Sequence, residues 1–177
     1  MGHYWEMLKL QREEDHPSHG TAVGVATGYV LRFYEQFLHA DLDHLDLEAI
    51  KNQRWTEAQR EEAVMQAYGR AVGRKLLDQE DNGLISWEEQ VRRIRVLQEN
   101  MAAIHSELTF LPSVSEVMAM YDRLGAPQTA AEIGIEGDLL RSSMLYGKDY
   151  RNRYSVFNAA WELGLLEQWV DRVLEKQ

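Results

Sequence analysis

The sequence contains no cysteine among its 177 residues. Disulfide bonds and thiolate metal sites are therefore excluded, and any metal ion must be held by His, Asp or Glu. The chain has no apolar run near the roughly 18 residues that a membrane-spanning helix needs, and Met1 to Glu6 do not form a secretory signal. We expect a soluble protein in the reducing cytoplasm.

Positive charge is also scarce. Lys and Arg together number 19, whereas Asp and Glu number 29, which gives a net charge of −10. Nucleic acids and anionic membrane surfaces are bound through a concentrated basic surface. We therefore expect neither a nucleic acid nor a membrane as a partner.

Proline is rare, and long stretches of the chain lack it. The three prolines are Pro17, Pro112 and Pro127, each at a place where a helix should begin or end. The stretches between them are rich in Leu, Ala, Glu, Gln, Arg and Met, which favour helix, and 45% of all residues are apolar, enough for a core. We predict one all-α, helical bundle-like domain over residues 1–177, without strands.

The clearest helical pattern runs from Gly20 to His39. Its apolar positions have the spacing of a helix with one buried face, and they are Val23, Ala26, Val30, Tyr34, Phe37 and Leu38. Glycines recur every four residues, at Gly20, Gly24 and Gly28, where a second backbone can approach closely. The polar stretch from Asp41 to Asp46 ends this helix.

Four N-terminal capping boxes follow along the chain. The pairs are Thr56 with Gln59, Ser86 with Glu89, Ser113 with Glu116, and Thr129 with Glu132. The first pair predicts one helix to about Leu77, and Gly125 predicts the cap that ends the third helix. Two more helices are expected, over about 137–150 and 155–175, the second split near Gly164.

The N-terminal part holds three histidines, at His3, His16 and His19. His16 and His19 flank Pro17 in a turn between two expected helices, and Gly20 leaves room beside His19. A neutral imidazole is a good ligand for Zn²⁺ or Fe²⁺. From spacing alone, a metal site and a pair of solvated loop histidines are both open interpretations.

Several stretches together resemble a known family. They are, in order, His3–Glu6, His19–Gly20 with Val23–Gly24, Leu111–Val114, Leu124–Thr129, Ile133–Ile135, Lys148–Tyr154 and Glu162–Leu166. Their order and spacing resemble the C-terminal half of the iron-containing alcohol dehydrogenase and dehydroquinate synthase superfamily. The last two look most like the bacterial branch of sn-glycerol-1-phosphate dehydrogenase, and the resemblance covers nearly the whole chain.

The resemblance implies a two-domain enzyme that interconverts glycerol-1-phosphate and dihydroxyacetone phosphate. A Rossmann-like domain would bind NAD(P), and a helical domain would hold a divalent metal, Zn²⁺ or another ion such as Ni²⁺ or Fe²⁺. By this resemblance, His3 matches the histidine that faces the substrate, and His19 matches a metal ligand.

Other parts of the family's site have no match in this sequence. The first metal-ligating His would fall just ahead of Met1, and the metal-ligating Asp and the nucleotide-binding domain are expected outside this chain. Gly20–Gly24 has helix spacing and does not match a dinucleotide fingerprint. We therefore expect no catalytic or cofactor-binding residue in this chain, no tightly bound cofactor and no activity from it alone.

The first helix is expected to be strongly apolar. Its large apolar residues are Tyr4, Trp5, Met7, Leu8 and Leu10. We expect an exposed apolar surface there, where the implied nucleotide-binding domain would pack, and therefore a homo-oligomer.

A basic cluster stands out in this acidic protein. Lys148, Arg151 and Arg153 would attract the phosphate of a substrate. However, Arg151 and Arg153 are two residues apart and would not share a helix face. Ion pairing with local carboxylates is the competing interpretation.

Two rival functions are open. The stretch from Asp78 to Glu89 follows the twelve-residue calcium loop, although Glu80 stands where Asp or Asn is usual and no second loop is found. The matching positions are Asp78, Asn82, Gly83, Ile85 and Glu89. The same stretch also fits an acidic helix–turn–helix that Ser86 caps. The second rival is a non-catalytic helical interaction protein descended from the enzyme.

Overall fold

The structure is a computed structural model, and it describes residues 1–79, 83–151 and 153–175. These residues form helices joined by turns and bends, so the all-α prediction is confirmed for this part of the chain. The elements are Gly2–Gln11 (α1), His19–Leu38 (α2), Leu47–Asn52 (α3), Glu57–Tyr68 (α4), Arg70–Leu77 (α5), Trp87–Glu107 (α6), Val114–Leu124 (α7), Ala131–Ile133 (η1, a 3₁₀ helix), Gly137–Tyr146 (α8), Gly147–Tyr150 (η2, a 3₁₀ helix), Val156–Glu162 (α9) and Leu166–Leu174 (α10). Among the helices of the described residues, none is long and apolar enough to cross a membrane.

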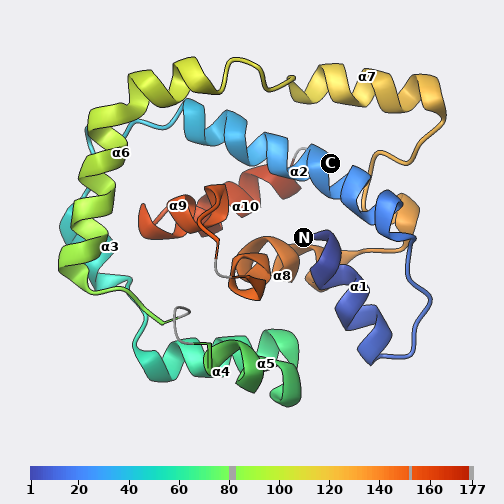
Figure 1. Ribbon diagram of the computed structural model, residues 1–177, viewed down its shortest axis with the longest axis horizontal. Coiled ribbons are helices and arrows are strands. Elements are labelled where there is room, and N and C mark those ends of the chain that lie inside the picture. The colour runs from blue at the N-terminus through green and yellow to red at the C-terminus, as the bar shows by residue number, and fades with distance from the viewer. Residues whose placement is uncertain (80–82, 152, 176–177) are drawn as a thin grey trace.

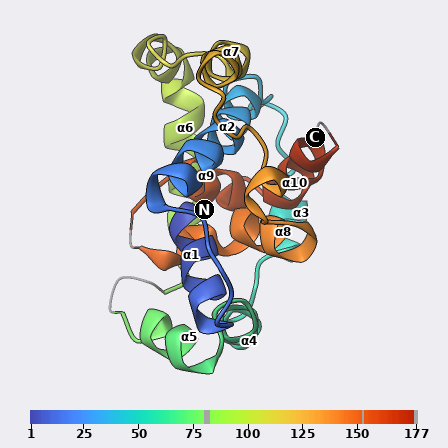
Figure 2. The same ribbon diagram turned by 90° about the vertical axis from the view of Figure 1, so that its right-hand side faces the viewer.

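Helix α2 is the centre of the arrangement. It contacts α1, α7, α9 and α10, and Figure 1 shows it crossing the molecule beside them. Its buried face includes Val25, Tyr29 and Phe33, and the Phe33 ring meets Trp169 of α10 with centroids 6.4 Å apart. Figure 2 shows α7 and the α4–α5 pair at opposite ends of the molecule. The core therefore follows α2 and is closed by segments from both halves of the chain.

Helix α1 is a core helix, and the prediction of an exposed apolar surface there is wrong. Trp5 is fully buried and Tyr4 is 1% exposed, whereas Leu10, near the end of the helix, is 59% exposed. The Tyr4 hydroxyl donates a hydrogen bond to the Ala67 carbonyl at 2.9 Å. The prediction fails because α2 and α8 pack on α1. The sequence of α1 alone does not indicate that α8, which lies more than 100 residues further along the chain, covers it.

Helix α7 packs on the glycine side of α2. The Tyr121 hydroxyl donates a hydrogen bond to the Gly24 carbonyl at 2.9 Å. A Cβ atom on Gly28 would lie 2.8 Å from the Met118 Cε atom. A Cβ atom on Gly20 would meet no atom within 4 Å. Side chains of α7 therefore approach Gly24 and Gly28, and within the described part of the chain the predicted close approach of a second backbone is found at none of the three glycines.

Local signals at helix ends act largely as predicted. Thr56 and Ser113 form capping boxes with Gln59 and Glu116. Gly125 ends α7 in the left-handed conformation, with φ of 60°. Side chains other than glycine rarely adopt this conformation, so Gly125 sets the end of α7.

Three other helix boundaries had mixed outcomes. The helix predicted from Thr56 to about Leu77 is interrupted at Gly69, whose φ of 75° lies outside the helical region. Helix α3, which Asp46 caps by accepting from the Ala49 amide, follows the polar stretch and was not predicted. The predicted split near Gly164 is confirmed, because this residue has φ of 70° and separates α9 from α10.

The predicted calcium loop is described only in part. Glu80 and Asn82 belong to residues 80–82, which lie outside the described residues. At the far end of the loop, Ser86 caps α6 by accepting from the Glu89 amide at 3.1 Å. The Glu89 carboxylate contacts the guanidinium of Arg92 at 2.7 Å. The described end of this stretch therefore has the contacts of a capped helix start.

Candidate functional site

Two of the three N-terminal histidines lie side by side. His3 belongs to α1 and His19 is the first residue of α2, and their ring centroids are 5.0 Å apart with an interplanar angle of 63°. Ser18 fixes the first turn of α2, because its side chain accepts a hydrogen bond from the Thr21 amide. The packing of α1 on α2 brings His3 to the same place. The fold thus joins the residue expected to face the substrate with the residue expected to bind metal.

A carboxylate orients the His19 ring. Glu6 Oε1 lies 2.8 Å from His19 Nδ1, and the Glu6 side chain is 17% exposed while that of His19 is 61% exposed. When Nδ1 carries the proton and donates it to Glu6, Nε2 keeps the lone pair that a metal ion requires. The sequence patterns gave Glu6 no role. Its position three residues after His3, on one helix face, is the signal that would have identified it.

His3 has the properties of a neutral imidazole. Its ring stacks on Tyr150, with centroids 5.9 Å apart and an interplanar angle of 23°. Partial loss of hydration lowers the pKa of His3 below its ordinary value, the positive charge of Arg151 lowers it further, and Glu6 opposes both effects. A neutral imidazole can accept a proton or a hydrogen bond from a hydroxyl group.

A cavity of about 390 Å³ adjoins His3, and Tyr150, Arg151 and Arg153 are among the other residues that line it. We call this cavity, together with His3, Glu6 and His19, the histidine cleft. His19 does not line the cavity itself; its side chain is largely exposed beside the His3 ring.

The three residues of the basic cluster differ: one is buried in an ion pair and two are exposed. Lys148 forms an ion pair with Asp149 at 2.8 Å, and both side chains are more than nine-tenths buried. Arg151 and Arg153 follow η2 on the surface, and neither has an ion pair with a carboxylate among residues 1–79, 83–151 and 153–175. Local ion pairing therefore accounts for Lys148, while the two arginines face the histidine cleft with their charge uncompensated by any described residue.

The third N-terminal histidine stands apart from this pair. His16 is exposed in the loop before α2, and its Nδ1 donates to the Pro17 carbonyl at 3.0 Å. Within the described residues, no group of three or more His, Cys, Asp or Glu side chains is placed to hold a metal ion. A structural or catalytic zinc site normally needs at least three protein ligands. The described part of the chain therefore offers His19, with Glu6 behind it, as one member of a ligand set.

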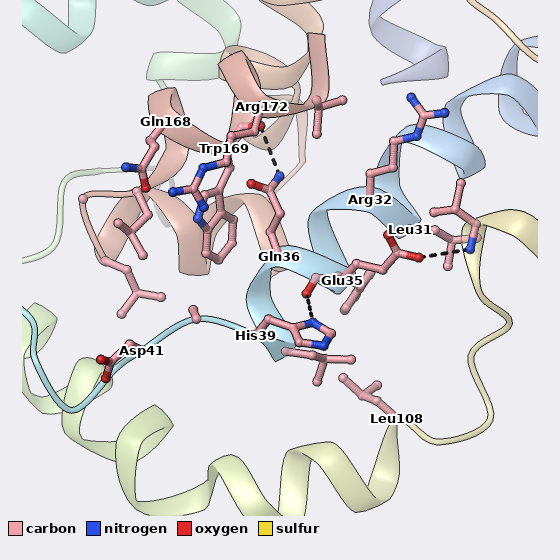
Figure 3. Close-up of a pocket in the computed structure, with 18 of the residues that line it drawn as sticks. Leu31, Arg32, Glu35, Gln36, His39, Asp41, Leu108, Gln168, Trp169 and Arg172 are labelled. Carbon is pink, nitrogen blue, oxygen red and sulfur yellow. Dashed lines mark hydrogen bonds between the residues drawn. The ribbon is translucent and has the colours of Figure 1, made fainter. Parts of the chain in front are cut away.

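A larger cavity, with a volume of about 1400 Å³, lies between α2, α10 and the connection from α6 to α7 (Figure 3). Two of the polar side chains that line it form hydrogen bonds between the helices on its opposite sides. Gln36 donates a hydrogen bond to the Trp169 carbonyl at 3.1 Å, and Glu35 accepts one from the Val114 amide at 3.2 Å. Acidic and basic side chains both line it, so it favours neither charge of ligand. We assign these contacts a structural role in joining α2 to α7 and α10.

Comparison with known proteins identifies no family for the chain. No protein-family model, no curated protein and no solved structure matches it.

Proposed function

We propose that the chain is the metal- and substrate-binding helical domain of an NAD(P)-dependent dehydrogenase that interconverts sn-glycerol-1-phosphate and dihydroxyacetone phosphate. The observation that supports this most is the pairing of His3 with His19 from two different helices, 5.0 Å apart. These are the two positions that the resemblance assigns to substrate and metal. The carboxylate of Glu6 on His19 Nδ1 is the kind of outer contact that metal-ligating histidines usually have.

Each residue of the cleft would have a distinct role. His19 would coordinate a divalent ion such as Zn²⁺, Ni²⁺ or Fe²⁺ through Nε2. Glu6 would keep the proton of the His19 ring on Nδ1 by accepting its hydrogen bond. His3 would accept the hydroxyl proton of the polyol during oxidation and return it during reduction. Arg151 and Arg153 would attract the phosphate end of the substrate, because arginine binds phosphate in a bidentate manner. The bound metal would polarise the reacting oxygen while the nicotinamide exchanges the hydride with the carbon.

The decisive test joins this chain to a nucleotide-binding domain that supplies the remaining Asp and His ligands. In that protein, His19→Ala should abolish metal binding and NAD(P)-dependent oxidation of glycerol-1-phosphate, with an unchanged circular dichroism spectrum. His3→Ala should keep the metal and lower the turnover number by about 10²–10⁴-fold, as expected for loss of a proton acceptor. The matched control is His16→Ala, since His16 is exposed and apart from the pair. Full metal occupancy with normal turnover in His19→Ala would overturn both the site and the family assignment.

The calcium interpretation predicts a different metal preference. Carboxylate and carbonyl oxygens bind Ca²⁺, whereas imidazole nitrogen prefers Zn²⁺. Titration of each ion into ¹⁵N-labelled chain would distinguish the two sites by the signals that move. We expect Zn²⁺ to move signals of His3 and His19, and a saturable response to Ca²⁺ between Asp78 and Glu89 would favour the rival function.

We also propose that the protein works in the cytoplasm as a homo-oligomer. Apolar side chains are exposed at Phe110 (75%) and Leu124 (78%), before and at the end of α7. Met120, one turn before Leu124 on α7, is 41% exposed, and apolar side chains exposed together are typical of association surfaces. Sedimentation analysis over a wide concentration range should show association, and a monomer throughout would contradict it. A non-catalytic interaction protein would associate without any response to metal or substrate.

A further inference from the structure

A second pocket combines an unusual number of positive charges in an acidic protein. It has a volume of about 520 Å³ and lies between the start of α4, α6, α9 and the segment from Lys148 to Tyr154. Its cationic side chains are Arg60, Arg92, Arg93, Lys148, Arg151 and Arg153. The carboxylates that line it are Asp149 and Glu162. We call this the arginine pocket.

Both carboxylates of the arginine pocket are already engaged. Glu162 is buried and accepts hydrogen bonds from the Arg93 guanidinium at 2.9 Å and the Tyr154 hydroxyl at 3.0 Å. Asp149 is paired with Lys148 at 2.8 Å. Neither carboxylate is therefore left to balance a further arginine.

Outside the pocket lining, Glu89 contacts Arg92 at 2.7 Å and Arg93 at 2.8 Å. Three cations of the lining then have no ion pair among the described residues, namely Arg60, Arg151 and Arg153. The pocket therefore carries a positive charge that the described part of the chain leaves unbalanced.

Arg60 is the most informative of the three. It is only 6% exposed, yet its side chain has no hydrogen bond or ion pair with any described residue. Among the described residues, the fully buried side-chain atoms without a partner are Trp5 Nε1 and Gln36 Oε1, so the Arg60 guanidinium keeps access to the pocket. An arginine that is otherwise so buried is normally paired. Because Arg60 lines the pocket, an anion bound there would supply the missing partner.

We propose that the arginine pocket binds a phosphate group, either as the free ion or as the phosphate monoester of a small metabolite. Arginine guanidinium groups bind phosphate oxygens through paired, charge-assisted hydrogen bonds. Trp55 and Trp161 also line the pocket and provide an apolar wall for the carbon part of such an ester. A volume of about 520 Å³ lies in the range of small-molecule sites.

The arginine pocket differs from the histidine cleft although both use Lys148, Arg151 and Arg153. Arg60 and Glu162 line the arginine pocket, and His3 lines the cleft. The proposal goes beyond the dehydrogenase reaction, since it requires no metal, no nicotinamide and no second domain. Because Arg151 and Arg153 line both cavities, variants of Arg60 and His3 are the ones that distinguish the two sites.

The test is calorimetric titration of the full chain with inorganic phosphate and, separately, with glycerol phosphate, at constant ionic strength set by chloride. We expect saturable binding of at least one of the two. Arg60→Met should weaken it by about tenfold or more, because at least one charge-assisted hydrogen bond is lost. Arg153→Gln should weaken it several-fold without harm to the fold, since this side chain is exposed and unpaired among the described residues. Arg95→Gln is the matched control, because Arg95 is exposed on α6 and does not line the pocket.

The two probes separate the sources of the phosphate. Equal affinity for both indicates a site for the phosphate group itself, and tighter binding of glycerol phosphate indicates a monoester site, and either supports the proposal. Phosphate should also raise the melting temperature of the wild type and not that of Arg60→Met. If Arg60→Met fails to fold, weaker binding in Arg153→Gln together with unchanged binding in His3→Ala supports the arginine pocket, because Arg153 lines both cavities and His3 lines only the cleft.

Three results would overturn the proposal. The first is absence of saturable binding with either probe. The second is binding that Arg60→Met and Arg153→Gln leave unchanged. The third is binding that is lost in His3→Ala and kept in Arg60→Met, because it would belong to the histidine cleft.

Discussion

The histidine cleft and the arginine pocket lie on either side of one short segment and balance their charges in opposite ways. In the cleft, the exposed His19 ring has a carboxylate partner in Glu6 at 2.8 Å. In the pocket, the buried Arg60 has no partner among the described residues. Polar groups in water need no protein partner, but buried charges do.

The difference indicates what each region lacks. The cleft offers a single oriented imidazole, which is too few ligands for a tight metal site, so it needs residues from elsewhere. The arginine pocket already has its cations together and needs only an anion. We therefore expect the isolated chain to bind phosphate and to bind metal weakly.

The largest expected effect tests whether the cleft depends on the core beneath it. Trp5 is fully buried on the helix that carries His3 and Glu6. Trp5→Ala should lower the free energy of unfolding by about 3–5 kcal/mol, the range for loss of a buried aromatic side chain. Urea denaturation followed by circular dichroism measures this value. Leu10→Ala on the same helix should cost less than about 0.5 kcal/mol, because Leu10 is 59% exposed. Equal losses in the two variants would contradict a core role for α1.

A smaller effect is expected at the carboxylate of the arginine pocket. Glu162→Gln should lower the free energy of unfolding by about 1–3 kcal/mol at neutral pH, because hydrogen bonds to Arg93 and Tyr154 are weakened. Glu99→Gln, at an exposed position on α6, is the control and should change it little.

The same variant has a distinct pH signature. Burial raises the pKa of Glu162 above its ordinary value, and the charge of Arg93 only partly opposes this. The folded protein therefore holds this proton at pH values where the unfolded chain has lost it, so the contribution of Glu162 to stability grows as pH falls through the raised pKa. It is complete below the ordinary glutamate pKa. Unfolding midpoints across this acidic range should reveal the gain in the wild type and not in Glu162→Gln, and parallel curves would contradict a buried Glu162.

The smallest effect concerns the charge link between the two regions. Arg151 lines both of them and lowers the pKa of His3. Arg151→Gln should therefore raise the pKa of His3 toward its ordinary value, which an NMR titration of the ring protons measures. Arg95→Gln should leave it unchanged, and an unmoved or lowered pKa in Arg151→Gln would show that the two regions are electrically separate.

His3 also gives stability a weak dependence on pH. Because its folded pKa lies below the ordinary value of 6.5, the unfolded chain takes up a proton first as pH falls below that value. The contribution of His3 is therefore present above 6.5 and is lost as pH falls through the folded pKa. The ring is partly solvated, so this effect on the free energy of unfolding should be small.

Much of the local structure follows from the sequence. The capping boxes at Thr56 and Ser113 and the left-handed Gly125 are where the patterns predict them. These features depend on neighbouring residues alone, because a side chain caps the amide three positions further on. The split at Gly164 belongs to the same class, since a glycine can adopt a positive φ at little cost.

The functional residues were only partly within reach of the sequence. His3 and His19 were selected by resemblance, and the fold brings them together. Glu6 was given no role, although it shares a helix face with His3. Nothing in the sequence marked Arg60 as unusual. It lies among polar residues in a predicted helix, where an arginine is normally exposed, and only the packing of that helix buries it.

By itself, the sequence determined the all-α content, most helix ends and the absence of thiolate chemistry, because these depend on residue types and short spacings. Only the tertiary structure decided that α1 is buried, that Glu6 meets His19 and that Arg60 has no carboxylate partner among the described residues. The physical reason is that burial and charge balance are properties of segments far apart in the chain. Tyr4 reaches the carbonyl of Ala67, and the walls of the arginine pocket come from α4, α6 and α9. Local sequence patterns do not indicate which distant segments pack together. The hydrogen-bond or ion-pair partner of each buried polar group is therefore determined only when the helices pack.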